Sequence, residues 1–162
     1  MTPEEYIKAN CRTAHLFPPH RRRKRLSTRY IVLHSTEAET AASTISWFLS
    51  PTQPLCAHYL IDTDGGVTQF GVDDDSLPHT GNNEYNSRSM GIEHVGFHTQ
   101  QSWPIKQLQA SAAVAAHLLH KYLLTTSSII LHSQVPRATH IDPGPYFPLQ
   151  QYVDMINAYH PI

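Results

Sequence analysis

Cysteine, charged residues and long apolar runs are all scarce in this chain of 162 residues. The two cysteines, Cys11 and Cys56, are too few for a scaffold held together by disulfides. No apolar run approaches the length of about 18 residues that a membrane-spanning helix requires, so we expect no membrane span. Charged residues make up 15% and hydrophobic residues 40% of the chain, which is typical of a folded globular domain and excludes a disordered chain.

The short motifs of several enzyme classes are also missing. The sequence contains neither a Gly-x-Ser-x-Gly nucleophile motif nor a glycine-rich phosphate-binding loop, and no histidine motif accompanies the cysteines. These absences argue against a serine or cysteine nucleophile and against a phosphate-binding-loop enzyme. Histidine, in contrast, is abundant, because the chain holds 12, as many as lysine and arginine together. Imidazole is a common metal ligand, so this excess raises the expectation of a metal site.

Basic residues are concentrated near the N-terminus. Of the 12 lysines and arginines, 8 lie in residues 1–30, and five of these form the run Arg21 to Arg25. We predict that residues 1–27 form a solvated basic arm, joined through Pro18-Pro19 to one folded domain over residues 28–162. The basic run has no interleaved aromatic residues, so we expect no nucleic-acid partner. Binding of the run to an anionic polymer stays as the alternative.

Short apolar runs alternate with helical patterns along the rest of the chain. We predict strands over 29–34, 58–62, 66–70, 89–95 and 128–132, and helices over 41–49, from 104 onward and over 149–158. The Asp64-Gly65 pair between the second and third strands predicts a hairpin. Because this hairpin interrupts the alternation of strands and helices, the expected fold is a single α/β domain with a central mixed β-sheet flanked by helices.

Two histidines lie at the ends of predicted strands. His34 ends the first strand and His132 ends the last one, and ligands collect at the carboxyl ends of strands in α/β sheets. Asp142 follows in a turn restrained by two prolines and a glycine, which leaves its carboxylate little freedom. Two imidazoles and one carboxylate suffice for a catalytic Zn²⁺ site with a fourth position for water. The alternative is that these are capping or core histidines.

Other histidine pairs carry weaker signals. His94 and His98 have the i, i+4 spacing of helical zinc ligands, but two glycines break this segment and the glutamate of such a motif is absent. His117 and His120 lie three residues apart on the predicted long helix, where a half-exposed surface pair is expected. Neither pair is therefore predicted to bind a metal.

Glu93 is the one carboxylate in the interior of a predicted strand, since Asp62 only ends one. Strand alternation places Gly91, Glu93 and Val95 on one face, and Ile92 and His94 on the other. A partly buried carboxylate near a metal is suited to deprotonate water. The alternative is a glutamate that faces solvent from an edge strand.

Six blocks of sequence recur in the order of a known family. They are Val32-Leu-His-Ser-Thr36, Ala57-His-Tyr-Leu-Ile-Asp62, Pro78-His-Thr-Gly81, Asn86-Ser-Arg-Ser-Met-Gly-Ile-Glu93, Leu131-His-Ser-Gln-Val-Pro136 and Thr139-His-Ile-Asp-Pro-Gly-Pro145. With these blocks the chain resembles, over residues 28–158, the zinc-dependent N-acetylmuramoyl-L-alanine amidases of type 2. That family includes phage amidases, the cytosolic amidase of cell-wall recycling and the peptidoglycan recognition proteins.

The resemblance implies a function and a site for residues 28–162. It assigns one Zn²⁺ ion to His34, His132 and Asp142, and it places Glu93 at the family's catalytic glutamate. The implied reaction is hydrolysis of the amide between the lactyl group of N-acetylmuramic acid and L-alanine of the stem peptide. Glu93 would act as general base toward zinc-activated water, and the substrate would be peptidoglycan or a soluble muropeptide.

Three further residues take their expected roles from the same resemblance. Many relatives carry a lysine two residues before the last metal ligand, and this chain has His140 there. A histidine can donate the same hydrogen bond to an oxyanion, but its charge depends on pH. His79 and Thr80, in the Pro-His-Thr-Gly block, are predicted to contact the substrate, and a turn-stabilising role is the alternative for His79.

A non-catalytic peptidoglycan-binding module is the alternative function, because some recognition proteins share the fold without hydrolysis. Such relatives typically lose a metal ligand, whereas all three candidates are present here, and this favours the catalytic amidase. The resemblance to phage amidases adds the expectation of a bacteriolytic, endolysin-like role. We expect a monomer. The first 20 residues lack the apolar core of a secretory signal, and the expected location is cytoplasmic, phage-released or that of a mature exported form.

Overall fold

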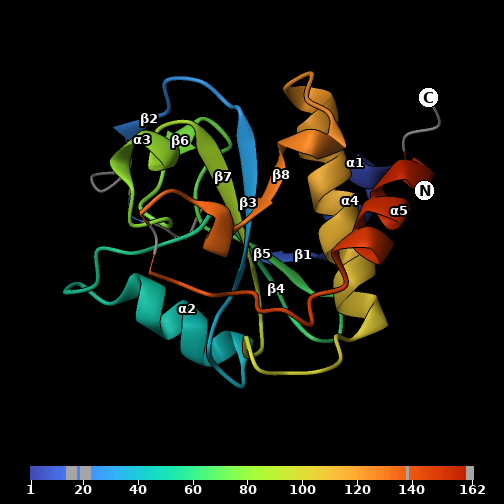
Figure 1. Cartoon of the computed structure of the whole chain (residues 1–162), viewed down its shortest axis with the longest axis horizontal. Helices are drawn as coiled ribbons and strands as arrows, with labels where there is room; N and C mark the ends of the chain where they lie inside the picture. Colours follow the sequence, from blue (N-terminus) through green and yellow to red (C-terminus); the bar gives the residue numbers. More distant parts are fainter. Residues whose placement is uncertain (14–17, 19–22, 138, 160–162) are drawn as a thin grey trace.

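A six-stranded mixed sheet forms the centre of the molecule (Figure 1). The computed structural model describes residues 1–13, 18, 23–137 and 139–159. In the spatial order β1-β5-β4-β7-β3-β8, the strands span Cys11–Thr13, Val67–Gln69, Tyr59–Ile61, Ser89–His94, Tyr30–Ser35 and Ile129–Leu131. β4 and β5 pair antiparallel, as the Asp64-Gly65 turn predicts, and the other neighbours pair in parallel. The predicted mixed sheet is therefore confirmed.

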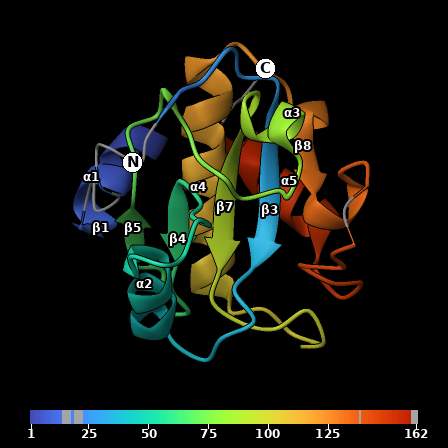
Figure 2. The same cartoon turned by 90° about the vertical axis from the view of Figure 1, so that its left-hand side faces the viewer.

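Helices cover both faces of this sheet. Figure 2 shows α4 (Ile105–Lys121) and α5 (Leu149–Tyr159) behind the sheet and α2 (Ala41–Leu49) in front of it. α2 begins where predicted, because the hydroxyl of its N-cap Thr40 accepts a hydrogen bond from the backbone N–H of Ser43. Among the helices that the structure describes, none combines the length and the apolar character needed to cross a membrane.

Strand alternation divides the core into two layers. Tyr59 and Ile61 of β4 pack with Ile92 of β7 in the layer under α4 and α5, whereas Leu60 packs with Phe48 in the layer under α2. Each fully buried side chain of this size contributes roughly 1.5–3 kcal/mol. A slip of one residue would turn these side chains to the wrong face, so the two layers set the register. The same register turns every second residue of β3 and β7 toward α2.

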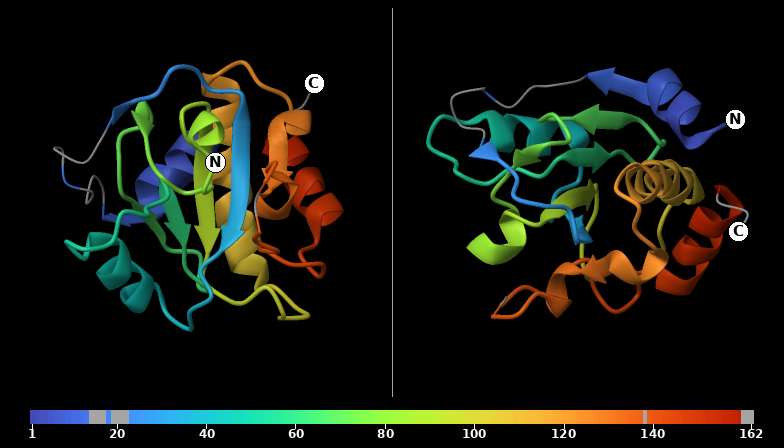
Figure 3. Two further views of the ribbon diagram at one scale, coloured as in Figure 1. Left: turned by 60° about the vertical axis from the view of Figure 1, so that its left-hand side comes forward. Right: turned by 90° about the horizontal axis from the view of Figure 1, so that it is seen from above.

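The N-terminal segment is partly built into the domain, which corrects the prediction of a solvated arm. Helix α1 (Pro3–Asn10) lies beside α4 in Figure 3, with Tyr6 and Ile7 packed against the core. β1 then extends the sheet next to β5. The prediction followed the basic charge of residues 1–27 and overlooked the apolar side chains that a short amphipathic helix can bury.

The basic run is also divided by the structure. Arg21 and Arg22 lie outside the described residues, and Arg23 and Lys24 form β2, which pairs antiparallel with β6 (Asp75–Ser76). Arg25 is buried, and its guanidinium donates hydrogen bonds to the carbonyl oxygen of Asp75 at 2.9 Å and to the hydroxyl of Tyr122 at 3.0 Å. Arg25 therefore stabilises the fold and is not part of a basic surface.

Candidate metal centre

His34 and His132 meet because their strands are neighbours. β3 lies between β7 and β8 and pairs in parallel with both, so the carboxyl ends of the three strands lie at one edge of the sheet. His34 is the penultimate residue of β3, and His132 directly follows β8 as the first residue of the short 3-10 helix His132–Gln134. The Nδ1 atoms of the two histidines are 3.0 Å apart. The structure thus brings together the two side chains that the strand ends predict.

Asp142 reaches the histidines from the loop that follows β8. Its Oδ1 lies 2.9 Å from Nδ1 of His132, and its Oδ2 lies 3.3 Å from Nδ1 of His34. The loop is held by Gly144, which has a φ of +95°. A Cβ at this position would lie 1.9 Å from the carbonyl oxygen of His98, so only glycine fits. This close approach anchors the turn that carries the carboxylate.

The partners of His132 indicate which of its nitrogens carries hydrogen. Nε2 lies 3.2 Å from the carbonyl oxygen of Thr80, and because a carbonyl oxygen can only accept, Nε2 is the donor. A neutral His132 therefore presents a bare Nδ1 to the carboxylate of Asp142 and to Nδ1 of His34. A cluster of lone pairs and negative charge at this burial requires a positive charge at its centre. Either a proton on His132 or a metal cation can supply it.

The spacing of the three side chains suits a metal ion. His34, His132 and Asp142 are buried, and one ligand atom from each lies within 4.8 Å of the others. Nitrogen and oxygen ligands at about 2.0–2.1 Å from a tetrahedral Zn²⁺ are separated from each other by about 3.3 Å. The separations of 2.9 to 3.3 Å in this group are close to that value. Two imidazoles and one carboxylate form a donor set that binds zinc more readily than calcium or magnesium, because the latter two prefer oxygen ligands.

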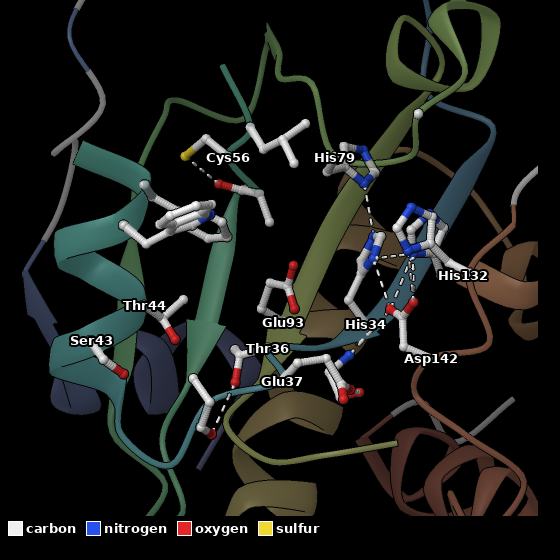
Figure 4. Close-up of a pocket in the computed structure, with 18 residues that line it drawn as sticks. His34, Thr36, Glu37, Ser43, Thr44, Cys56, His79, Glu93, His132 and Asp142 are labelled. Atoms are coloured by element: carbon white, nitrogen blue, oxygen red, sulfur yellow. Dashed lines mark hydrogen bonds and ion pairs between the residues drawn. The ribbon is translucent and has the colours of Figure 1, made fainter. Parts of the chain in front are cut away.

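Glu93 faces the same cavity from the neighbouring strand. The β3–β7 register pairs it directly with His34, and Figure 4 shows its carboxylate pointing into the cavity. Glu93 is 9% exposed, and within the described part of the chain its Oε2 has no hydrogen-bond partner. Burial raises the pKa of Glu93 well above its usual range, and the negative charges of Asp142 and Glu37 act in the same direction. A buried carboxylate without a partner favours a cation beside it or a proton on it.

His140 stands at the mouth of the site. Its imidazole stacks on that of His132, with ring centroids 4.5 Å apart and an angle of 15° between the planes. The side chain is 58% exposed, and its Nδ1 lies 3.9 Å from Oδ1 of Asp142. His140 is therefore close to the candidate metal ligands and accessible to a substrate, as an oxyanion-stabilising group must be.

His79 and Thr80, the predicted substrate contacts, are both buried, and His79 also lines the cleft beside the candidate ligands. Thr80 is fully buried, and its hydroxyl lies 2.8 Å from Oδ1 of Asn86. His79 is 8% exposed, with one ring nitrogen 2.9 Å from Nε2 of His34 and the other 3.2 Å from Oγ of Ser89. Burial lowers the pKa of His79 well below its usual value, so this imidazole is neutral at pH 7. Both ring nitrogens of His79 are engaged inside the protein, while the residue borders the cleft, so its contact with a substrate stays a prediction.

The site opens into a cleft of about 480 Å³, and the sequence analysis did not predict the residues on one side of it. One side is formed by the three candidate ligands with Glu93 and His140, and the other by α2 and the segment that follows it. Trp47 and Leu55 line that second side and are 59% and 44% exposed. One sequence signal could have predicted this side of the cleft. Trp47 lies on α2 outside the apolar face formed by Ile45, Phe48 and Leu49, so it is not needed for the core.

The histidine pairs that the sequence analysis set aside lie elsewhere. His94 is on the opposite face of the sheet, where its Nε2 lies 2.7 Å from Oγ of Ser111 and its ring packs against Trp103 and Phe147. His117 lies 4.0 Å from a carboxylate oxygen of Asp73 on the α4 side. These histidines are not brought to the candidate metal centre.

The sequence profile described as N-acetylmuramoyl-L-alanine amidase matches residues 24–145, which is 122 of the 162 residues. The chain belongs to this type 2 amidase family. Every residue of the candidate centre, from His34 to Asp142, lies inside the match. N-acetylmuramoyl-L-alanine amidase A from Achromobacter lyticus is 29% identical to the chain over 153 residues, which covers 81% of this chain and 84% of the relative. The amidase activity of the family acts on peptidoglycan.

Solved structures of other amidases share the fold. A crystal structure of a selenomethionine derivative of AmpD has a TM-score of 0.79 at 22% identity, over 91% of this amidase and 95% of AmpD. AmiD from E. coli, solved with anhydro-N-acetylmuramic acid-L-Ala-D-gamma-Glu-L-Lys as substrate, has a TM-score of 0.70 at 21% identity, over 79% of this chain and 57% of AmiD. The catalytic domain of XlyA has a TM-score of 0.71 at 16% identity, over 89% of this chain and 98% of that domain. These TM-scores show that the chain shares the fold of these amidases.

Proposed function

We propose that this amidase hydrolyses the amide between the lactyl group of N-acetylmuramic acid and L-alanine of the stem peptide, with one Zn²⁺ ion and with Glu93 as general base. The observation that carries the proposal is the arrangement around a single cleft. Three buried donor side chains that require a positive charge stand beside the buried carboxylate of Glu93, whose Oε2 has no hydrogen-bond partner among the described residues. The substrate of AmiD contains the same class of bond, between a muramic acid and L-alanine.

His34, His132 and Asp142 would hold the zinc ion. When bound, zinc supplies a Lewis acid that polarises the scissile carbonyl and makes water easier to deprotonate. The three side chains come from a strand, a strand end and a turn anchored by Gly144, so their positions are set before binding. A bound zinc ion would also supply the positive charge that these three buried donor groups require.

Glu93 would move the proton during the reaction. Its carboxylate accepts a proton from the attacking water and passes it to the amide nitrogen as that nitrogen leaves. Between these two transfers the side chain is protonated and neutral. Burial favours this neutral form, from which the proton passes to the leaving nitrogen. The absence of a hydrogen-bond partner for Oε2 within the described residues leaves this oxygen available for the transfer.

His140 would stabilise the oxyanion, and its replacement provides a test. We expect His140→Ala to lower kcat/KM about 10²-fold, because the developing oxyanion loses a hydrogen-bond donor. His140→Lys restores a donor at the same position and should recover most of this loss. His120→Ala, at an exposed position on α4, is the control and should keep the wild-type kcat/KM. Wild-type kcat/KM in His140→Ala would remove the oxyanion role.

Trp47 would contact the substrate on the far wall of the cleft. We expect Trp47→Ala to raise KM for muropeptides about tenfold while kcat changes less than twofold, because the lost apolar contact acts equally on substrate and transition state. Steady-state kinetics on a soluble muropeptide measures both constants. Leu123→Ala removes a side chain that is 92% exposed and outside the cleft lining, and it should change neither constant. A loss confined to kcat would contradict this role.

The proposed activity is tested by product analysis joined to metal analysis. Purified enzyme is incubated with peptidoglycan, and mass spectrometry should find free stem peptides that begin with L-alanine together with glycan that has lost its peptides. Metal analysis of the same preparation should find about one zinc ion per chain. Binding to peptidoglycan without release of stem peptide would favour the non-catalytic module instead.

A further inference from the structure

A chain of hydrogen bonds runs from His34 away from the candidate metal centre. Nε2 of His34 lies 2.9 Å from Nδ1 of His79, and Nε2 of His79 lies 3.2 Å from Oγ of Ser89. Oγ of Ser89 lies 2.6 Å from the carbonyl oxygen of Tyr85, in the short helix α3 (Asn83–Asn86). His34, His79 and Ser89 are 2%, 8% and 0% exposed, so the chain is shielded from water.

The carbonyl at the far end sets the direction of every bond. Two oxygens 2.6 Å apart need a hydrogen between them, and the carbonyl of Tyr85 has none, so the hydroxyl of Ser89 donates to it. Oγ of Ser89 then accepts from Nε2 of His79. A neutral His79 is left with a bare Nδ1, which accepts from Nε2 of His34. His34 therefore carries its hydrogen on Nε2 and turns a bare Nδ1 toward Asp142.

The surroundings of His79 are shaped to hold this ring. Its imidazole lies directly over Gly91 of β7, where a Cβ would come within 2.6 Å of Nδ1 of His79. A glycine inside a strand often marks such a close approach. The backbone N–H groups of His79 and Thr80 both donate to Oδ1 of Asn86, at 3.1 and 2.9 Å. The same loop carries the carbonyl of Thr80, which accepts from Nε2 of His132.

We propose that His79 and Ser89 are positioning residues that hold His34 in the tautomer whose Nδ1 is free to bind the metal ion. The proposal rests on the proposed function for the ion itself, and it adds how the protein prepares the ligand. Partners of this kind, one bond removed from the metal, change metal affinity about 10- to 100-fold when they are removed. Neither His79 nor Ser89 needs to touch the substrate for this role.

The position of the hydrogen on His34 can be read directly. Long-range ¹H–¹⁵N spectra of the full chain with ¹⁵N-labelled histidine distinguish the two tautomers, and the signals of His34 are those lost in His34→Gln. In metal-free wild-type protein at neutral pH we expect hydrogen on Nε2 alone. In Ser89→Ala the chain loses its anchor, and we expect a mixture of both tautomers. Hydrogen on Nδ1 of His34 in the wild-type protein would overturn the proposal.

Zinc affinity provides the second measurement, by competition with a chromophoric chelator. Ser89→Ala and His79→Leu should weaken zinc binding at least tenfold. His79→Asn should recover part of the loss, because its amide oxygen can replace Nδ1 as the acceptor. Ser111→Ala is the matched control, since Ser111 is also a buried serine bonded to a buried histidine, His94, but on the other face of the sheet.

The two proposals fail in different ways. If wild-type protein binds no zinc, the proposed function fails, and the spectra of the metal-free protein still decide where His34 carries its hydrogen. If wild-type protein binds zinc and Ser89→Ala binds it within twofold of the wild-type affinity, the positioning role is wrong and the proposed function stands. If His79→Leu does not fold, Ser89→Ala, which keeps the imidazole in place, carries the test.

Discussion

Glu93→Gln is expected to lower kcat for the release of stem peptide about 10²- to 10⁴-fold while the zinc content of the enzyme stays the same. An amide cannot accept the proton of the attacking water, and Glu93 is not among the three candidate ligands. The fold should be unaffected, because burial already favours the neutral form of this side chain and glutamine is a neutral residue of nearly the same shape. Kinetics on a soluble muropeptide and metal analysis of the same preparation measure the two effects.

Glu37 provides the matched control for this substitution. It is a second carboxylate that lines the same cleft, but its oxygens lie 2.7 Å from Oγ of Ser35 and 2.7 Å from Nδ1 of His98. Because these oxygens are engaged within the protein, Glu37→Gln should reduce kcat much less than Glu93→Gln does. Near-wild-type turnover in Glu93→Gln would show that another group takes the proton.

His132→Ala is expected to lose both the metal and the activity. Removal of one of three protein ligands leaves too few donors for a stable site, and the carboxylate of Asp142 loses its partner at 2.9 Å. Zinc content should fall from about one ion per chain to background, and kcat should fall by at least about 10³-fold. Treatment of the wild-type enzyme with a chelator should produce the same loss, which added zinc reverses.

An exposed histidine serves as the control for the metal prediction. His120 is exposed on α4, outside the residues that line the cleft, and His120→Ala should keep zinc and full activity. Zinc bound by His132→Ala with wild-type stoichiometry and affinity would place the ion at other residues. This pattern differs from that of Glu93→Gln, in which activity is lost and the metal stays, so the two variants separate metal binding from proton transfer.

Most of the regular elements follow from local patterns in the sequence. The strand at Tyr30–Ser35 and the helices at Ala41–Leu49 and Leu149–Tyr159 lie within a residue or two of their predicted bounds, because apolar periodicity and capping residues act over a few neighbours. α1 and β1 were missed, because the basic charge of the N-terminal residues masked the two apolar side chains that dock on the core. An exposed charged side chain does not exclude that apolar residues next to it in the sequence are buried.

The candidate site was predictable in part. His34, His132, Asp142 and Glu93 could be chosen because strand ends, a restrained turn and a carboxylate inside a strand are visible along the chain. For His79 the sequence left a substrate contact and a turn-stabilising role open, and the structure places its ring between His34 and Ser89 at the border of the cleft. The sequence carries no sign of that role, because the bonds that define it cross between separate segments and end on a backbone carbonyl.

The amino-acid sequence by itself determined the element types, the mixed character of the sheet and the residues able to bind a metal, since these depend on local pattern and side-chain chemistry. Only the tertiary structure decided that β3 lies between β7 and β8, which places His34 beside both Glu93 and His132. It also brings the carbonyls of Thr80 and Tyr85 to the hydrogen-bond networks of these histidines, and the proposed tautomers depend on these two carbonyls. Every residue has a carbonyl group, so the sequence does not distinguish these two, and only the folded chain brings them to the histidines.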